Sequence, residues 1–176
     1  KPFGFQHYEV IPDLIACGKG MGGGVPLSGV IGSSQIMDLP DVGNMSSTHS
    51  ANPLVCAAGL AVLNELEEKN LIKEAHEKGK ILLKLLENLK AIFPKNINYV
   101  FCKGLIAAIH CKSTKKEMND DFFTSKITEK CYQKGLLVVH TGRESIKIGP
   151  PLTISIEALE EGIAVIAESI REVISS

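Results

Sequence analysis

The chain has 176 residues with 19 basic and 20 acidic side chains, so its formal net charge is −1, and 44% of its residues are hydrophobic. This length is sufficient for a substantial core in one or two domains. The balanced charge argues against a nucleic-acid-binding protein, which usually carries a basic stripe. We also expect no membrane span, because no apolar run approaches the roughly 20 residues that cross a bilayer.

The first residue and the cysteines indicate how the chain arises and in which compartment it is expected. It begins with Lys1 and not with Met, which fits either a processed chain or a fragment. The number of cysteines is odd and their spacing contains no C-x-x-C, so we expect neither a disulfide framework nor a zinc site, and a reducing cytoplasmic location. We interpret them as small buried hydrophobic residues; they are Cys17, Cys56, Cys102, Cys111 and Cys131.

The N-terminal part is rich in glycine and poor in positive charge. Nine of the sixteen glycines lie in the first 43 positions, and Lys19 is the only lysine or arginine between Pro2 and Glu68. Apolar runs at residues 13–17 and 25–32 predict two buried strands on either side of a glycine-rich loop.

A helix is predicted to follow these strands. Asn52 is a suitable N-cap residue and Pro53 suits the first helical turn, so we expect a helix that continues to Glu68.

From residue 70 the chain alternates amphipathic elements without a strict βαβ order, which predicts a small α+β domain. Apolar residues recur at helical spacing after Asn70 until Pro94 stops the helix. Gly135 is expected at the C-terminal cap of a second helix, and Ser155 at the N-cap of a third. The expected helices are residues 70–92, 121–134 and 155–174, and the expected strands are residues 98–101, 105–111, 136–140 and 145–148.

The glycine-rich loop at residues 18–24 has two interpretations. Gly18, Gly20 and Gly23 satisfy G-x-G-x-x-G, but a dinucleotide-binding loop must open a helix, whereas Pro26 and the apolar residues after it favour a turn and a strand. The alternative places the chemistry on Lys19. Burial would lower the pKa of the Lys19 amine, a neutral amine can form a Schiff base, and flanking glycines let a bulky cofactor approach.

The sequence around Lys19 resembles the cofactor-attachment signature of the class III (ornithine/4-aminobutyrate type) pyridoxal-phosphate-dependent aminotransferases. Residues 13–23 read Asp-Leu-Ile-Ala-Cys-Gly-Lys-Gly-Met-Gly-Gly. The likeness runs in order through most of the chain, and its other parts are His7-Tyr8, Pro12, Pro26-Leu27, Ser-Thr-His-Ser-Ala-Asn-Pro at residues 47–53 and Pro-Pro-Leu-Thr-Ile at residues 150–154.

This resemblance implies an α/β fold in which residues 1–69 are the C-terminal part of the large domain of a PLP fold-type I (aspartate-aminotransferase-like) enzyme. Residues 70–176 are then the small C-terminal α+β domain. It implies that Lys19 forms a Schiff base with pyridoxal 5'-phosphate and then moves a proton between the substrate Cα and the cofactor. Thr48 matches the family's phosphate contact, which reaches the site of the partner subunit in a homodimer.

One departure from the family pattern concerns the substrate. The family commonly has an arginine before the Pro-Pro-Leu turn to hold a substrate carboxylate, and Lys147 occupies that position. Lysine attracts a carboxylate as a point charge and lacks the planar fork of arginine. Arg143 is a second candidate for the carboxylate, whereas Arg171 is expected on a solvated helix face. The missing arginine keeps lyase or racemase chemistry open as an alternative.

A second departure concerns the cofactor ring. In the family an aspartate upstream of the attachment lysine pairs with the pyridinium nitrogen, and only Glu9 is acidic before Asp13. We therefore expect a fragment of a larger enzyme that does not transaminate by itself. A catalytically incomplete module that serves only assembly is the remaining alternative.

The sequence therefore predicts part of a transaminase that moves an amino group from an amino acid or ω-amine to a 2-oxo acid. The amino donor and the acceptor are not specified by these residues. We expect no metal centre, because the histidines show no ligand spacing; they are His7, His49, His76, His110 and His140.

Overall fold

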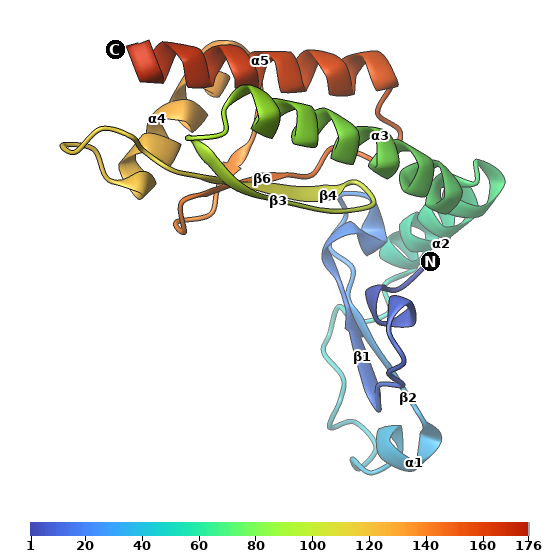
Figure 1. The fold of residues 1–176 in the computed structure, drawn as a ribbon. Helices are drawn as coiled ribbons and strands as arrows, with labels where there is room; N and C mark the ends of the chain where they lie inside the picture. Colours follow the sequence, from blue (N-terminus) through green and yellow to red (C-terminus); the bar gives the residue numbers. More distant parts are fainter. Residues whose placement is uncertain (176) are drawn as a thin grey trace. The chain divides into compact units, whose positions relative to one another are not determined.

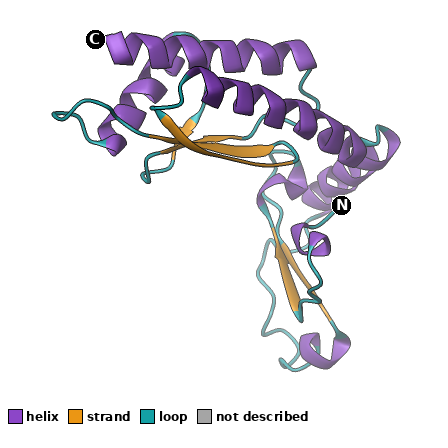
Figure 2. Cartoon of the chain, in the orientation of Figure 1, coloured by secondary structure: helices purple, strands orange, loops and turns teal. Residues whose placement is uncertain are grey.

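A computed structural model describes residues 1–175 and divides the chain into two compact units, Lys1–Ile72 and Lys73–Ser176 (Figure 1). We refer to them as the first and the second unit and describe each by itself. Helices, strands and loops are all represented (Figure 2). The assignment of the two units to a large and a small domain stays a prediction.

The first unit contains a short antiparallel strand pair and one long helix. Strands β1 and β2 pair with Ile15 opposite Ile31, and α2 is the only helix of this unit longer than one or two turns among the described residues. Strand β2 begins four residues later than expected, because residues 25–28 form an irregular segment that leads into it. The elements are η1 (Gly4–His7), β1 (Leu14–Cys17), η2 (Lys19–Gly22), β2 (Gly29–Gly32), α1 (Ser34–Met37) and α2 (Pro53–Glu68).

The expectation that these two strands are buried is wrong for this chain. Leu14, Val30 and Ile31 are each about half exposed. Two strands of four residues form a sheet too small to bury its own faces, so burial depends on what other elements cover them. Apolar character therefore identified the strands correctly but not their burial.

Helix α2 begins where its capping residue predicts. The Asn52 side chain accepts a hydrogen bond of 2.9 Å from the Leu54 backbone N–H, and Pro53 occupies the first turn. This bond satisfies one of the amide groups left unpaired at a helix start. The cap fixes the residue at which the preceding loop becomes helix.

The second unit is a four-stranded antiparallel sheet with helices packed on one face. The strand order is β3-β4-β6-β5, with β3 and β5 at the edges. The elements are α3 (Leu71–Ile92), β3 (Ile97–Lys103), β4 (Ile106–Cys111), α4 (Asp120–Gln133), β5 (Val139–His140), β6 (Ser145–Ile148) and α5 (Ile156–Ser175).

Within residues 1–175 no helix is both long and apolar enough to cross a membrane.

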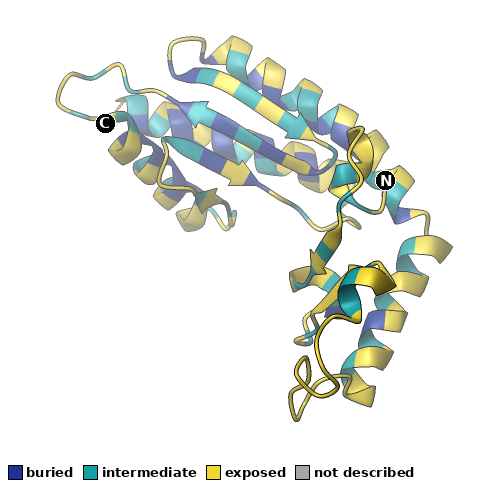
Figure 3. Cartoon of the chain, turned by 90° about the horizontal axis from the view of Figure 1, so that it is seen from below, coloured by how far each residue is buried: buried dark blue, intermediate teal, exposed yellow. Residues whose placement is uncertain are grey.

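The core of the second unit forms between the helices and the inner face of the sheet. Leu82, Leu86 and Leu89 lie one helical turn apart on α3 and are almost fully buried, as the spacing predicts. They pack in one cluster with residues of α4, α5 and the sheet, among them Phe123 and Ile170. Side chains on the opposite face of the sheet are largely exposed (Figure 3).

The end of α4 explains why strand β5 is shorter than predicted. Gly135 has φ +83°, its N–H donates to the Tyr132 carbonyl, and the Leu136 N–H donates to the Cys131 carbonyl. These two bonds form a Schellman cap, as the glycine predicts. The cap uses the start of the expected strand, so only Val139 and His140 pair with β6.

The cysteines are unpaired and differ in burial. Cys111 and Cys131 are buried in the second unit, whereas Cys56 is exposed in the first. Burial raises the pKa of the Cys111 thiol to about 12 and also raises the pKa of Cys131. The interpretation as buried hydrophobic residues is confirmed for these two and wrong for Cys56.

Candidate active site

Lys19 lies at the start of a tight turn that follows strand β1. The lysine turn, residues 18–23, is closed by hydrogen bonds of 3.2 Å from Met21 N–H to the Gly18 carbonyl and from Gly23 N–H to the Gly20 carbonyl. Lys19 itself has φ +50°. This left-handed conformation costs a residue with a side chain about 1–2 kcal/mol. Backbone strain of this kind is concentrated at functional sites, and Lys19 shares it with Ala51 and Asn70 in the first unit.

The lysine turn packs closely against helix α2 at glycine residues. Gly22 is the buried residue of the turn and Gly59 is the buried residue of α2. A methyl group on Gly59 would lie 2.5 Å from Leu27 Cδ2, and one on Gly23 would lie 3.0 Å from Val62 Cγ2. The turn and the helix therefore approach as closely as glycine permits.

The side of the turn that carries Lys19 is open. Lys19 and residues 24–28 line a hollow of about 360 Å³. Lys19 is exposed, so the expected burial is wrong here, because glycines supply no side chain to cover it. Within the described part of the chain its amine makes no hydrogen bond or ion pair. The amine is therefore available to a ligand in the hollow.

Thr48 lies on an exposed serine-rich turn before α2. Ser50 Oγ donates to the Ser47 carbonyl at 2.7 Å and accepts from the Ser47 N–H, which holds the turn closed around Thr48. Ala51 follows with φ +52°, and Asn52 then caps α2. The Thr48 hydroxyl has no hydrogen-bond partner among residues 1–175, which leaves it free for an oxyanion.

Arg143 and Lys147 lie in the second unit, on the hairpin of β5 and β6. Arg143 is exposed in the turn, next to Glu144 with φ +51°. Lys147 lies on β6 in register with Ala108 and Val139, so its side chain belongs to the exposed face of the sheet. The sequence-predicted site residues thus fall into two pairs, Lys19 with Thr48 in the first unit and Arg143 with Lys147 in the second.

The residues around Lys19 fit the aldehyde end of pyridoxal phosphate. An unpaired amine faces a hollow, and a Cβ on Gly20 or Gly24 would have no atom within 4 Å. The glycines near the amine therefore leave open space on the side of the hollow. A free hydroxyl on Thr48 is the donor type that a phosphate oxygen needs.

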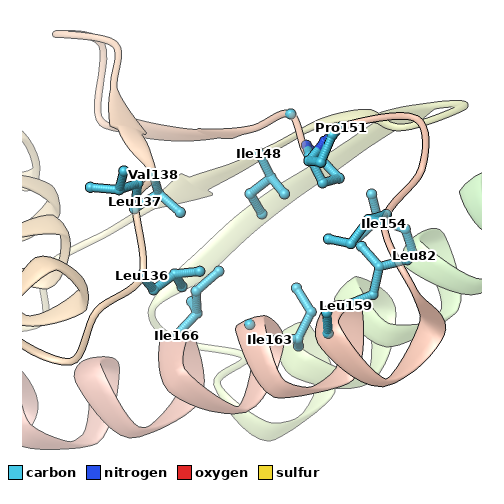
Figure 4. A pocket seen from close by; sticks show the side chains of 14 residues that line it. Leu82, Leu136, Leu137, Val138, Ile148, Pro151, Ile154, Leu159, Ile163 and Ile166 are labelled. Atoms are coloured by element: carbon cyan, nitrogen blue, oxygen red, sulfur yellow. The ribbon is translucent and has the colours of Figure 1, made fainter.

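A second cavity lies in the second unit and has a different character. It measures about 250 Å³ and is lined by apolar residues of α3, α5, β6 and the Pro150-Pro151 turn (Figure 4). Leu82, Ile148 and Ile163 are among them, and none of the lining residues is ionisable. Proton transfer requires a titratable group, so this cavity does not account for the chemistry expected of Lys19.

Sequence reasoning missed the contact between Leu27 and Gly59. Leu27 entered the resemblance only as part of Pro26-Leu27, and Gly59 was an ordinary position in a predicted helix. The two residues are 32 positions apart, and no local pattern marks such a contact. A glycine inside a predicted helix was the available signal, because glycine there often marks a close packing contact.

Comparisons with known proteins identify the family. A family model described as aminotransferase class-III matches residues 1–170. The leucine/methionine racemase of Thermococcus litoralis is 36% identical over 177 residues, which cover 98% of this chain and 39% of the racemase. The acetylornithine aminotransferase of Clostridium acetobutylicum is 31% identical over 170 residues, covering 96% of this chain and 41% of that enzyme.

A solved structure agrees with these relatives. The crystal structure of acetylornithine aminotransferase from Elizabethkingia anophelis superposes with a TM-score of 0.84 at 30% identity, covering 98% of this chain and 42% of that one. The chain thus spans about two fifths of the length of the curated relatives it matches. It belongs to the class-III aminotransferases, a family of pyridoxal-phosphate-dependent enzymes of PLP fold-type I.

Proposed function

We propose that this chain carries the cofactor-attachment lysine of a transaminase, which moves an amino group from an amino acid or ω-amine to a 2-oxo acid. The observation that carries the proposal is the unpaired amine of Lys19, held on a strained turn beside an open hollow. Family membership supports it.

Lys19 has two tasks in this proposal. Its Nζ would condense with the aldehyde carbon of the cofactor with loss of water, and once a substrate amine had displaced it, the freed amine would move the proton between the substrate Cα and the cofactor side. When bound, pyridoxal phosphate supplies the electron sink that makes this proton acidic. The glycines on both sides of Lys19 leave room for the amine to move between these positions.

The remaining candidate residues position the two ligands. Thr48 donates its hydroxyl to the cofactor phosphate, in the site of the partner subunit of a homodimer. Lys147 or Arg143 attracts the substrate carboxylate. We propose further that residues 1–69 belong to the large domain and residues 70–176 to the small domain, and that the protein is cytoplasmic, where unpaired cysteines persist.

Racemisation is the second candidate function, and one observation favours it. The Thermococcus litoralis relative is named a leucine/methionine racemase and is 36% identical to this chain. Lys147 also replaces the arginine that the transaminase pattern predicts. A racemase returns the proton to the opposite face of the substrate Cα and needs no 2-oxo acid.

Covalent labelling tests the role of Lys19. The chain is incubated with pyridoxal phosphate, reduced with borohydride and digested, and the modified lysine is identified by mass spectrometry. We expect label on Lys19 and its loss in Lys19→Ala, whereas the exposed Lys73→Ala retains it. Label spread over other lysines with none on Lys19 contradicts the proposal; if such a chain still associates with itself, the assembly-only alternative replaces it.

Product analysis separates the two activities in an enzyme that contains this chain. The enzyme is given an L-amino acid with and without a 2-oxo acid. A transaminase forms a new amino acid only when the 2-oxo acid is present. Formation of the D-amino acid without a 2-oxo acid replaces the transaminase proposal with the racemase.

A further inference from the structure

We propose that Leu27 is a positioning residue for Lys19, acting as a wedge between the lysine turn and helix α2. The proposal rests on the proposed function, because it concerns how the attachment lysine is held. It adds a residue that acts on Lys19 through its contacts with the lysine turn and with α2.

The contacts of Leu27 connect three elements of the first unit. A Cβ on Gly22 of the lysine turn would lie 3.2 Å from Leu27 Cβ, and a Cβ on Gly59 of α2 would lie 2.5 Å from Leu27 Cδ2. Leu27 therefore occupies the space that side chains would fill at both glycines. It lies half-buried between the one buried residue of the turn and the one buried residue of the helix.

The same residue also lines the Lys19 hollow. Residues 24–28 line it together with Lys19, and Ser28 Cβ would lie 3.7 Å from a Cβ on Gly18. The segment that carries Leu27 thus runs beside the lysine turn on one side and contacts α2 on the other. A shift of Leu27 moves the wall of the hollow and the base of the turn together.

The lysine turn needs such a support because it is short and strained. Its residues 19–22 form the 3-10 helix η2, and Lys19 within it holds an unfavourable left-handed conformation. Strained conformations persist only where the surroundings hold them in place. Small displacements of a reacting group reduce rates steeply, so the support of the turn affects the chemistry at Nζ.

The test compares variants with two readouts. The first is amide hydrogen exchange of Met21 and Gly23 by NMR in the cofactor-free chain, and the second is the rate of borohydride-trapped labelling of Lys19 by pyridoxal phosphate. For Leu27→Ala we expect exchange about tenfold faster and labelling about tenfold slower than in the unmodified chain. Leu27→Met fills the same space and should restore both.

Two further variants keep the proposal falsifiable. Leu63→Ala removes the same atoms from an exposed position of α2 and should change neither readout. Gly59→Ala raises the helix propensity of α2 but displaces Leu27, so it should loosen the turn without exposing the α2 amides. If Leu27→Ala unfolds the first unit, the effect of Gly59→Ala on the two readouts tests the role of Leu27 in its place.

The outcomes separate this inference from the proposed function. If the unmodified chain takes no label on Lys19, the proposed function fails. If Lys19 is labelled but neither folded Leu27→Ala nor Gly59→Ala changes the exchange or the labelling rate, Leu27 does not position Lys19. Equal effects of Leu63→Ala would also overturn the inference.

Discussion

The first and second units of this chain bury their apolar residues to very different extents. All 21 residues of the hydrophobic core cluster lie between Leu82 and Val173, in the second unit. In the first unit Leu54, Leu60 and Leu63 of α2 are each more than half exposed, as is Ile31 of β2. The second unit therefore has a core of its own, whereas the first is held by backbone pairing and a few close contacts.

The unit with the large apolar core is therefore not the unit that contains Lys19 and Thr48. Lys19 and Thr48, the proposed attachment lysine and the proposed phosphate contact, lie in the unit with little core, on backbone segments with positive φ at Lys19 and Ala51. Regions with few buried apolar contacts open at low free energy. Each of the following predictions tests whether the two units respond to substitution as this contrast requires.

The largest difference is expected between two identical deletions. Leu86→Ala removes a side chain with 0% exposure from the second unit and should lower the free energy of unfolding by about 3 kcal/mol. Leu63→Ala, at 58% exposure in the first unit, should stay within about 0.5 kcal/mol. Urea denaturation followed by circular dichroism measures both, and similar losses would contradict the contrast between the units.

A smaller effect is expected at two helix glycines of the second unit. A Cβ on Gly79 would lie 2.6 Å from the Gly104 backbone, which cannot rotate away, so Gly79→Ala should cost about 2 kcal/mol. Gly162→Ala meets only Leu136 Cδ1 at 3.5 Å and should stabilise α5 by about 0.5–1 kcal/mol. Opposite shifts in melting temperature support close packing at Gly79, and a stabilising Gly79→Ala would refute it.

In the first unit, the strained backbone at Lys19 is expected to affect stability more than the loss of its side chain. Lys19→Gly and Lys19→Ala both remove the amine, but only glycine adopts φ +50° without a penalty. Lys19→Gly should therefore be more stable than Lys19→Ala by about 1 kcal/mol. Hydrogen exchange of the first unit measures the difference, and equal protection would mean that the turn is not strained.

The smallest effect concerns an exposed ion-pair network of the second unit. Lys134 Nζ lies 2.8 Å from Glu172 and 2.7 Å from Glu168, joining α4 to α5. The Lys134 ammonium holds the pKa of the Glu172 carboxyl below its usual value. The stabilisation from Glu172 is therefore present above the unfolded-state pKa of about 4.3 and is lost as the pH falls through the lower folded-state pKa.

The corresponding measurement compares melting temperatures between pH 7 and pH 3. Glu172→Gln should melt slightly below the unmodified chain at pH 7, and the gap should close towards pH 3. Glu87→Gln replaces a carboxylate on the surface of α3, outside the ion-pair network, and serves as the control for the loss of a surface charge. A gap for Glu172→Gln that persists at pH 3 would exclude the ion pair as its cause.

Local rules predicted the helices well, because capping and periodicity act over a few residues. Asn52, Ser155 and Gly135 mark helix ends through bonds to near neighbours, and the Ser155 Oγ indeed accepts from the Ala158 N–H at 3.1 Å. The same locality explains the error at β5, where the helix cap and the predicted strand competed for the residues after Gly135.

The site was predicted by residue type and resemblance, while its geometry was not. Lys19 and Thr48 follow from the motif, but the positive φ of Lys19 and its exposure depend on how the glycines beside it fold. The contact of Leu27 with Gly59 depends on chain segments that meet only in the folded unit. Burial of β1 and β2 also could not be predicted, since it depends on what covers them.

The distribution of cysteines gives each unit its own reporter of opening. Cys56 is exposed in the first unit and should react with a maleimide at once, whereas Cys111 and Cys131 must wait for the second unit to open. Labelling followed by peptide mass analysis would follow Cys111 and Cys131 separately from Cys17 and Cys102, which are only partly buried, and so report opening of the second unit without an engineered probe. The stability of that core can therefore be followed as a rate of alkylation in the unmodified sequence.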